Sequence, residues 1–252
     1  MSIRKDTIWK SDELVKKYLT GTRGAIPLAV EQLDIFARVM VHHRPQVKRF
    51  LDIGCGDGIM ASVILEHYPE AEGVLVDFSP GMIEAAKERM ADKSHQMEIL
   101  LLDYGEKDWN RADAFGEPFD VIVSGLSIHH QPDERKQELY REIFDMLIPG
   151  GVFLNLEHVA PAGIWGDDLF DEYMIDSFYR DQQKKGGGLS REEVKAKYIS
   201  RGAREANLLS PMELQCQWLR DIGFIETDCF FKAFELALFG GWKPETGESI
   251  HP

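Results

Sequence analysis

From residue 50 onward, short apolar runs alternate with stretches of helical periodicity. Five such runs lie at residues 50–53, 74–77, 97–102, 119–124 and 152–156. This alternation predicts a parallel sheet that is covered by helices on both faces. Two further runs, at 224–231 and 234–239, flank a tight turn near Lys232 and Ala233 and predict a closing antiparallel hairpin. The predicted fold class is therefore α/β, a three-layer sandwich around a seven-stranded, mostly parallel sheet.

The remaining segments fit one domain over residues 1–252 with four parts. Residues 1–46 carry two helical patterns, and residues 47–159 form the core of the predicted sheet. Residues 160–209 break the strand and helix rhythm by mixing aromatic and acidic side chains, and we expect a helical lid there. Residues 210–244 supply a closing helix and the hairpin.

Composition and net charge limit the kinds of molecule that the protein is expected to bind. The 252 residues are 44% hydrophobic and 29% charged, which suits a globular interior, and the net charge of -14 opposes binding of nucleic acid. No stretch approaches the about 20 apolar residues that cross a bilayer, and the N-terminus lacks the apolar run of a signal peptide. Three cysteines without paired spacing predict neither disulfides nor a metal site. We expect a cytoplasmic protein with no membrane partner; a homodimer is one possible oligomeric state.

The first apolar run ends in a glycine-rich turn. Residues 51–58 read LDIGCGDG, and a helical pattern follows from Ile59. Glycines at such a turn let a ligand approach the backbone, and the helix N-terminus favours polar or anionic groups. The spacing is G-x-G-x-G, whereas dinucleotide folds use G-x-G-x-x-G, so a nicotinamide oxidoreductase is disfavoured.

Asp77 ends the second run, about 20 residues beyond the glycine turn. A carboxylate at this position can accept hydrogen bonds from both hydroxyls of an adenosine ribose. Its other interpretation is a cap for the next helix, but Ser79 followed by Pro80 already fits that role. The sequence therefore favours Asp77 as a ribose ligand.

Five motifs follow one another between residues 50 and 157: DIGCGDG, VDFSPGMIEAA, LLDYGE, FDVIVSGLSIHH and LIPGGVFLNLEHV. Their order resembles that of class I S-adenosylmethionine-dependent methyltransferases, which have a Rossmann-like sheet. The resemblance implies a transferase that binds S-adenosyl-L-methionine, methylates a small-molecule acceptor and releases S-adenosylhomocysteine.

Carried over by position, the resemblance implies a set of donor-binding residues. Gly54 and Gly56 would line the methionine part, Asp52 would support its amino group, and Asp77 would bind the ribose. The adenine would lie between Phe78 and Met82. The remaining implied residues are Asp103 for the adenine amine, the Tyr104 backbone beside it, and Ser124 facing the donor.

Methyl transfer mainly requires that the acceptor be aligned with the methyl carbon and shielded from water. If the acceptor must lose a proton, the candidate bases are His129, His130, Glu157 and His158, which lie just past the ends of the fourth and fifth predicted strands. Packing or loop capping is an equally good interpretation of these histidines.

The insert and the C-terminal segment QWLRDIGF also resemble carboxy-S-adenosylmethionine synthase, which carboxylates the donor methyl group. That enzyme holds the added carboxylate with a tyrosine in the turn before the second helix and an arginine in the insert. Here the turn reads TRGAIP without a tyrosine, although Arg201 lies near the expected arginine. Two more possibilities stay open: a non-catalytic adenosyl-binding protein, and an acceptor carboxylate bound by Arg180, Arg201 or Arg204.

Overall fold

A computed structural model describes residues 4–161, 163–200 and 202–245 of the chain. Within them, seven strands form a single sheet in the order β3-β2-β1-β4-β5-β7-β6. The strands are β1 (Arg49–Ile53), β2 (Glu72–Asp77), β3 (Met97–Leu101), β4 (Phe119–Gly125), β5 (Leu147–His158), β6 (Ile225–Ala233) and β7 (Leu236–Trp242). The first five are parallel, and β7 pairs antiparallel with both β5 and β6. The predicted Rossmann-like fold is thereby confirmed.

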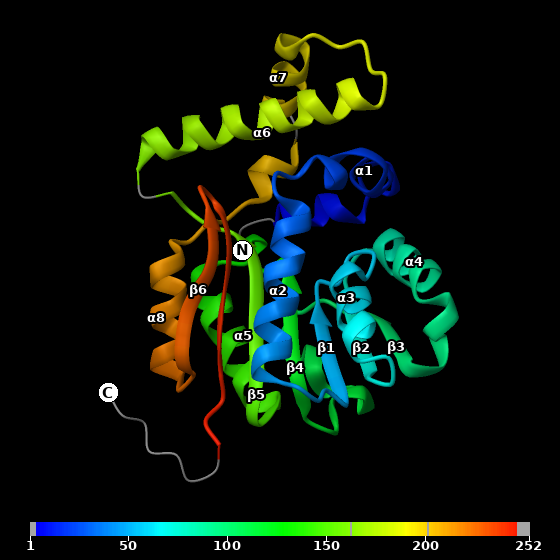
Figure 1. Cartoon of the computed structure of the whole chain (residues 1–252), viewed down its shortest axis with the longest axis vertical. Helices are drawn as coiled ribbons and strands as arrows, with labels where there is room; N and C mark the ends of the chain where they lie inside the picture. Colours follow the sequence, from blue (N-terminus) through cyan, green and yellow to red (C-terminus); the bar gives the residue numbers. More distant parts are fainter. Residues whose placement is uncertain (1–3, 162, 201, 246–252) are drawn as a thin grey trace.

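Helices cover both faces of this sheet (Figure 1). The α-helices are α1 (Asp12–Lys17), α2 (Ala29–His43), α3 (Ile59–His67), α4 (Pro80–Arg89), α5 (Asp133–Met146), α6 (Ile164–Lys184), α7 (Arg191–Ile199) and α8 (Met212–Ile222). Short 3-10 or π turns include η1 (Asp6–Lys10), η2 (Tyr18–Thr22), η3 (Arg23–Ala25), η7 (Ile128–His130) and η8 (Gly202–Ala206), and others are η4 (Ala91–Gln96), η5 (Trp109–Arg111) and η6 (Asp113–Phe115).

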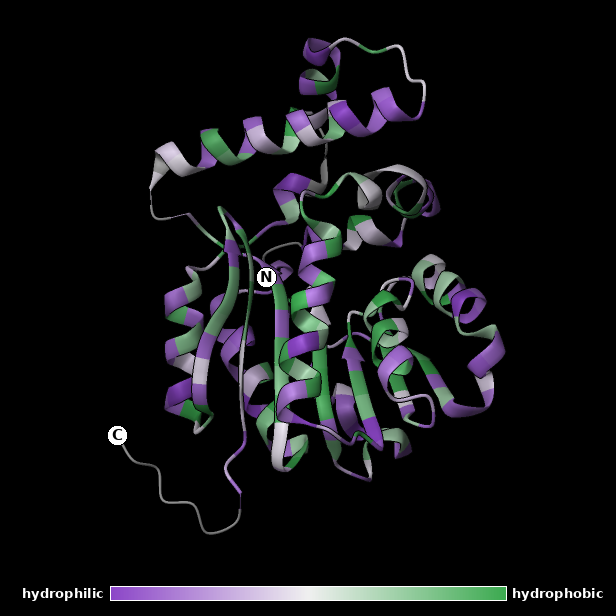
Figure 2. Cartoon of the chain, in the orientation of Figure 1, coloured by the Kyte–Doolittle hydropathy of each residue, from purple (hydrophilic) through white to green (hydrophobic). Residues whose placement is uncertain are grey.

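Successive residues of the central strands pack into different hydrophobic layers. In β1, Phe50 packs with α2 and α3, whereas Leu51 and Ile53 pack with α5 and α8. Because side chains alternate across a strand, a strand that is apolar on both faces must be covered twice. The hydropathy colouring shows the resulting green sheet between helices with mixed faces (Figure 2). The core therefore lies on both sides of the sheet.

The closing hairpin differs from its prediction in position. β6 continues through Ala233, and the turn is formed by Phe234 and Glu235, not by Lys232 and Ala233. Phe234 adopts a left-handed backbone with φ 54°, a conformation that a tight turn imposes. The alternating pattern gave no signal for this shift, because Phe234 is apolar yet 44% exposed.

The insert lies beyond the carboxyl ends of the parallel strands (Figure 1). There α6 crosses above the sheet, and α7 packs against α6. Its last residues rejoin the core at Lys136 of α5, which is fully buried. The ammonium group of Lys136 donates hydrogen bonds to the carbonyl of Leu208 and the hydroxyl of Ser210. The insert is thus tied to the layer of helices below it.

Candidate active site

A cavity of about 520 Å³ lies at the carboxyl ends of the strands, between the sheet and the insert. A smaller hollow of about 90 Å³ adjoins it, and Gly54, Gly56 and Leu126 line both. Pockets of a few hundred Å³ hold small-molecule ligands, and open α/β sheets bind them at this edge. The glycine turn is therefore part of the wall of a ligand-sized cavity.

The glycines of the turn adopt conformations that other residues avoid. Gly54 has φ +64° and Gly56 has φ +56°. A Cβ atom built on Gly54 would lie 1.8 Å from Oγ of Ser127, so no larger residue fits without displacing the β4 loop. The turn thus leaves its backbone open to a ligand, as the sequence predicted from its glycines.

Asp77 is buried at the wall of the larger cavity. Its carboxylate accepts hydrogen bonds from the backbone amides of Gly56 (3.0 Å) and Ser79 (2.8 Å). Burial raises the pKa of Asp77 to about 6, although these amides favour the ionised form. The Ser79 hydroxyl donates to the carbonyl of Trp9 (2.6 Å) instead of capping α4, so Asp77 also takes part in the cap.

Three other residues that are expected to bind the methyl donor line the two hollows. Phe78 and Met82 line the larger cavity beside Asp77, and Asp52 lines the smaller one with no exposed surface. An apolar pair (Phe78 and Met82) and two buried carboxylates (Asp77 and Asp52) near the glycine turn have the chemistry to bind the groups of S-adenosylmethionine. The residues present therefore fit this donor.

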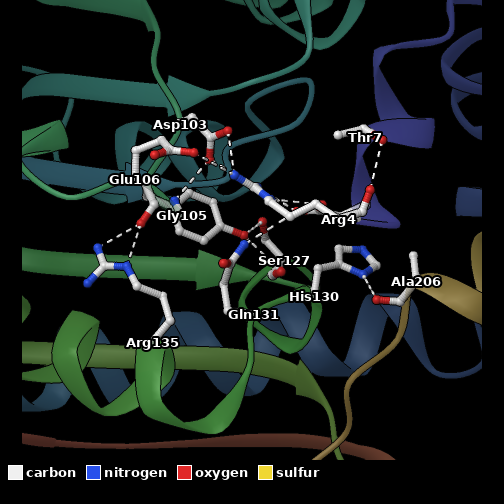
Figure 3. Close-up of polar contacts among 12 residues, drawn as sticks. Arg4, Thr7, Asp103, Gly105, Glu106, Ser127, His130, Gln131, Arg135 and Ala206 are labelled. Atoms are coloured by element: carbon white, nitrogen blue, oxygen red, sulfur yellow. Dashed lines mark hydrogen bonds and ion pairs between the residues drawn. The ribbon is translucent and has the colours of Figure 1, made fainter. Parts of the chain in front are cut away.

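Asp103 and Tyr104 are not among the residues that line the two hollows, and their contacts with adenine stay a prediction. Asp103 is held by Arg4, whose guanidinium contacts both carboxylate oxygens at 2.8 and 3.1 Å (Figure 3). Arg4 also pairs with Asp6 at 2.6 Å and lies over the ring of Phe78. The carbonyl of Tyr104 accepts from Arg135. Sequence reasoning missed Arg4, since nothing in the local pattern joins residue 4 to residue 103.

Ser124 does not face the cavity either. Its hydroxyl is fully buried and donates to the carbonyl of Ile53 at 2.8 Å, which ties β4 to β1. The wall is formed instead by the next three residues, Gly125, Leu126 and Ser127. Leu126 has φ 52°, a left-handed conformation that costs about 1 kcal/mol and turns the chain across the glycine loop.

His129 and Glu157 form a buried pair from β4's loop and β5. Nδ1 of His129 lies 2.5 Å from Oε1 of Glu157, and the backbone amides of His129 and His158 also donate to this carboxylate. Burial raises the pKa of Glu157 to about 7 and lowers the pKa of His129. Since the carboxylate accepts at Nδ1, the Nε2 lone pair of His129 is left for a ligand, and His129 lines the cavity.

The other two candidate histidines differ in what they can do. His130 donates from Nδ1 to the carbonyl of Ala206 (3.1 Å) and keeps Nε2 as an acceptor. His158 has both ring nitrogens engaged: Nε2 donates to Glu235 (2.7 Å), and Nδ1 accepts from the amide of Asn207 (3.3 Å). The arrangement therefore leaves His129 and His130 as proton acceptors, with His158 as a fixed part of the wall.

The N-terminal segment and the insert supply the rest of the wall. Trp9 and Tyr18 reach it from the N-terminal turns, and Lys197 and Arg204 reach it from the insert. Arg204 pairs with Asp171 at 2.6 Å, Arg180 is exposed away from the cavity, and Arg201 lies outside the described residues. Helical periodicity gave no reason to single out Trp9 or Tyr18.

Residues 50–151 match the family described as a methyltransferase domain. These residues therefore carry a methyltransferase domain. Its donor is S-adenosylmethionine, as expected for this family. Human N-acetylserotonin methyltransferase, solved in complex with SAM, has the same fold, with a TM-score of 0.60 and 14% identity over 96% of this chain and 60% of that one.

Relatives differ in how much of the methyltransferase chain they match. A highly reducing polyketide synthase of Emericella nidulans is 33% identical over 132 residues, which is 50% of this chain and 5% of that protein. Carboxy-S-adenosyl-L-methionine synthase of Desulforapulum autotrophicum is 26% identical over 227 residues, which is 88% of this chain and 85% of the synthase. The first similarity spans a small part of its relative, whereas the second spans most of both chains.

The described residues contain neither a metal-binding cluster nor a membrane-spanning helix. Residues 4–161, 163–200 and 202–245 contain no group of three or more His, Cys, Asp or Glu side chains placed to hold a metal ion. In the same ranges, no helix combines the length and apolarity needed to span a membrane.

Proposed function

We propose that this domain methylates a hydroxyl oxygen of a small planar molecule, with His129 as the base and Glu157 as its positioning residue. The observation that carries the proposal is the His129–Glu157 pair on the wall of the cavity that Asp77 and the glycine turn also line. When bound, S-adenosylmethionine supplies an electrophilic methyl group. The donor ligands proposed here are Asp52, Gly54, Gly56, Asp77, Phe78 and Met82.

The residues around the acceptor have two further roles, proton transfer and exclusion of water. Nε2 of His129 takes the hydroxyl proton, and the Glu157 carboxylate stabilises the imidazolium that results. Phe170, Phe178 and Tyr198 of the insert line the far wall and exclude water from the acceptor. A cavity of about 520 Å³ in a chain of net charge -14 favours a small molecule over nucleic acid. The free thiols of Cys55, Cys216 and Cys229 support a reducing compartment such as the cytoplasm.

The test is His129→Asn, which keeps an amide N–H for Glu157 and removes the Nε2 lone pair. We expect transfer of a radiolabelled methyl group to a pool of phenolic acceptors to fall by about 10²- to 10⁴-fold. Binding of S-adenosylhomocysteine, measured by calorimetry, should stay unchanged. The control is His67→Asn, because His67 is exposed at the end of α3. Full turnover in His129→Asn would remove His129 from the base role.

A second candidate is carboxylation of the donor methyl group. The synthase relative aligns over 88% of this chain, and Tyr18, just before the turn that lacks a tyrosine, lines both hollows. Lys197 and Arg204 provide positive charge on the insert side of the cavity. Native mass spectrometry of the purified protein separates the two candidates, because a bound carboxylated donor supports this one and a bound S-adenosylmethionine supports methyl transfer.

A further inference from the structure

His130 has a proton arrangement fixed by a backbone group. A carbonyl oxygen only accepts hydrogen bonds, so the contact between Nδ1 of His130 and the carbonyl of Ala206 places the proton on Nδ1 (Figure 3). Nε2 of His130 is then an acceptor. The carbonyl belongs to η8 of the insert, so the insert sets the tautomer of a residue in the β4 loop.

His129 has the same tautomer for a different reason. When Glu157 is ionised, its carboxylate, which receives two backbone N–H groups, accepts a hydrogen bond from Nδ1 of His129. The two rings lie side by side, with centroids 4.0 Å apart and planes 50° apart, and both line the cavity. Each ring thus keeps Nε2 as an acceptor, on two adjacent residues that line one cavity.

Both imidazole rings are neutral before the acceptor binds. Burial and the neighbouring imidazole lower the pKa of His130 to about 3, and burial also lowers the pKa of His129. A ligand with one hydroxyl group satisfies one of these nitrogens and leaves the other buried without a donor. Sites of this kind discriminate strongly against ligands that lack one partner group.

We infer that the acceptor carries two hydroxyl groups on neighbouring atoms of a planar ring, one methylated beside His129 and the other held by Nε2 of His130. This inference rests on the proposed methyl transfer. At the first hydroxyl the O–H bond breaks and its proton passes to His129, while the oxygen–methyl bond forms and the sulfur–methyl bond breaks, its electron pair staying on sulfur. His130 thereby selects which hydroxyl is methylated.

The planar ring follows from the surroundings of the histidines. Aromatic side chains of the insert also line the cavity, among them Phe170, whose ring centroid lies 5.2 Å from that of His158. Such rings favour a flat, apolar ligand body over a flexible polyol. The two polar contacts are then confined to one edge of the ligand.

The first experiment measures binding by calorimetry in the presence of saturating S-adenosylhomocysteine. The probes are 1,2-dihydroxybenzene, 3,4-dihydroxybenzoate and 2,3-dihydroxynaphthalene, each with its monohydroxy counterpart. We expect at least one diol to bind ten times more tightly than its counterpart. The inference is overturned when no diol binds, or when each diol binds no more tightly than its counterpart.

The second experiment repeats the comparison with His130→Asn, whose amide keeps a donor for Ala206 but has no group at the position of Nε2. We expect the diol preference to disappear while affinity for the monohydroxy probe stays the same, with His67→Asn as the matched control. An unchanged preference would contradict the role of His130. A protein that does not bind S-adenosylhomocysteine defeats the proposed function itself, whereas methylation of monohydroxy acceptors without a diol preference defeats only this inference.

Discussion

At the scale of single residues, burial decides the chemistry of the site. Asp77 and Glu157 are both acids whose pKa is raised by burial, to about 6 and about 7 respectively. Each is nevertheless surrounded by backbone N–H groups that bind the ionised form. Both carboxylates are therefore placed to change charge near neutral pH, where a small shift alters what they can accept.

Donor binding should depend on pH through Asp77. Ribose hydroxyls donate to the carboxylate, so the donor prefers the ionised form, and affinity should rise as pH rises through about 6. We expect the dissociation constant for S-adenosylmethionine to fall by about tenfold between pH 5 and pH 7, as measured by calorimetry. Asp77→Asn should lose this dependence, whereas Glu157→Gln should keep it. An equal slope in Asp77→Asn would assign the titration to another group.

Removing the carboxylate tests the same residue at constant pH. Asp77→Ala leaves the ribose hydroxyls and the amides of Gly56 and Ser79 without their acceptor. We expect donor binding to weaken by about 1 to 3 kcal/mol at pH 7.5. Calorimetry that gives the wild-type affinity would contradict the assignment of Asp77 to the ribose.

At the scale of elements, the N-terminal segment (residues 4–22) closes one side of the donor cavity. Trp9 and Tyr18 line the cavity, while Arg4 fixes the start of the segment to Asp103 and lies over Phe78. The two contacts of Arg4 to Asp103 are of the bidentate kind, which holds geometry as well as charge. We therefore infer that Arg4 holds this segment in place.

Loss of the Arg4 contacts should speed release of the donor. We expect Arg4→Ala to raise the dissociation rate of S-adenosylmethionine by about tenfold in stopped-flow fluorescence, equivalent to about 1.4 kcal/mol. The matched control is Lys5→Ala, since Lys5 pairs only with the exposed Glu205 at 3.6 Å. Unchanged or slower release in Arg4→Ala would contradict this role of Arg4.

At the scale of the whole molecule, the insert and the core are held together by a buried charge. Lys136 is fully buried, pairs with Asp133 at 3.1 Å, and donates to groups at the end of the insert. The amide of Leu208 also donates to the carbonyl of His129 at 2.8 Å. The histidine loop and the insert therefore share one network.

Breaking that network should destabilise the fold. Lys136→Ala removes the donor to the Leu208 carbonyl and the buried Ser210 hydroxyl, and we expect the free energy of unfolding to fall by on the order of 3 kcal/mol in urea titration. Lys87→Ala removes an exposed pair with Glu84 and should change stability little. Equal stability of the two variants would show that the Lys136 contacts contribute no more than a surface pair.

The sequence alone determined the sheet, the glycine turn and the position of Asp77, because these depend on periodicity and on residues close together in the chain. Gly54, Asp77, Phe78 and Met82 all follow strands whose ends meet at one edge, so a local pattern suffices to place them beside one cavity. The hairpin turn lies further along the chain than predicted, because Phe234 is apolar but exposed, and the pattern assumes that apolar residues are buried.

Only the tertiary structure decided which side chains are free to act. Whether His129, His130 or His158 keeps a free nitrogen depends on Glu157, Ala206 and Glu235, which lie 28, 76 and 77 residues away in the chain. The pairing of Arg4 with Asp103 spans 99 residues. A hydrogen bond is satisfied by proximity in space, and sequence patterns carry information only over the few residues of a strand or a helical turn.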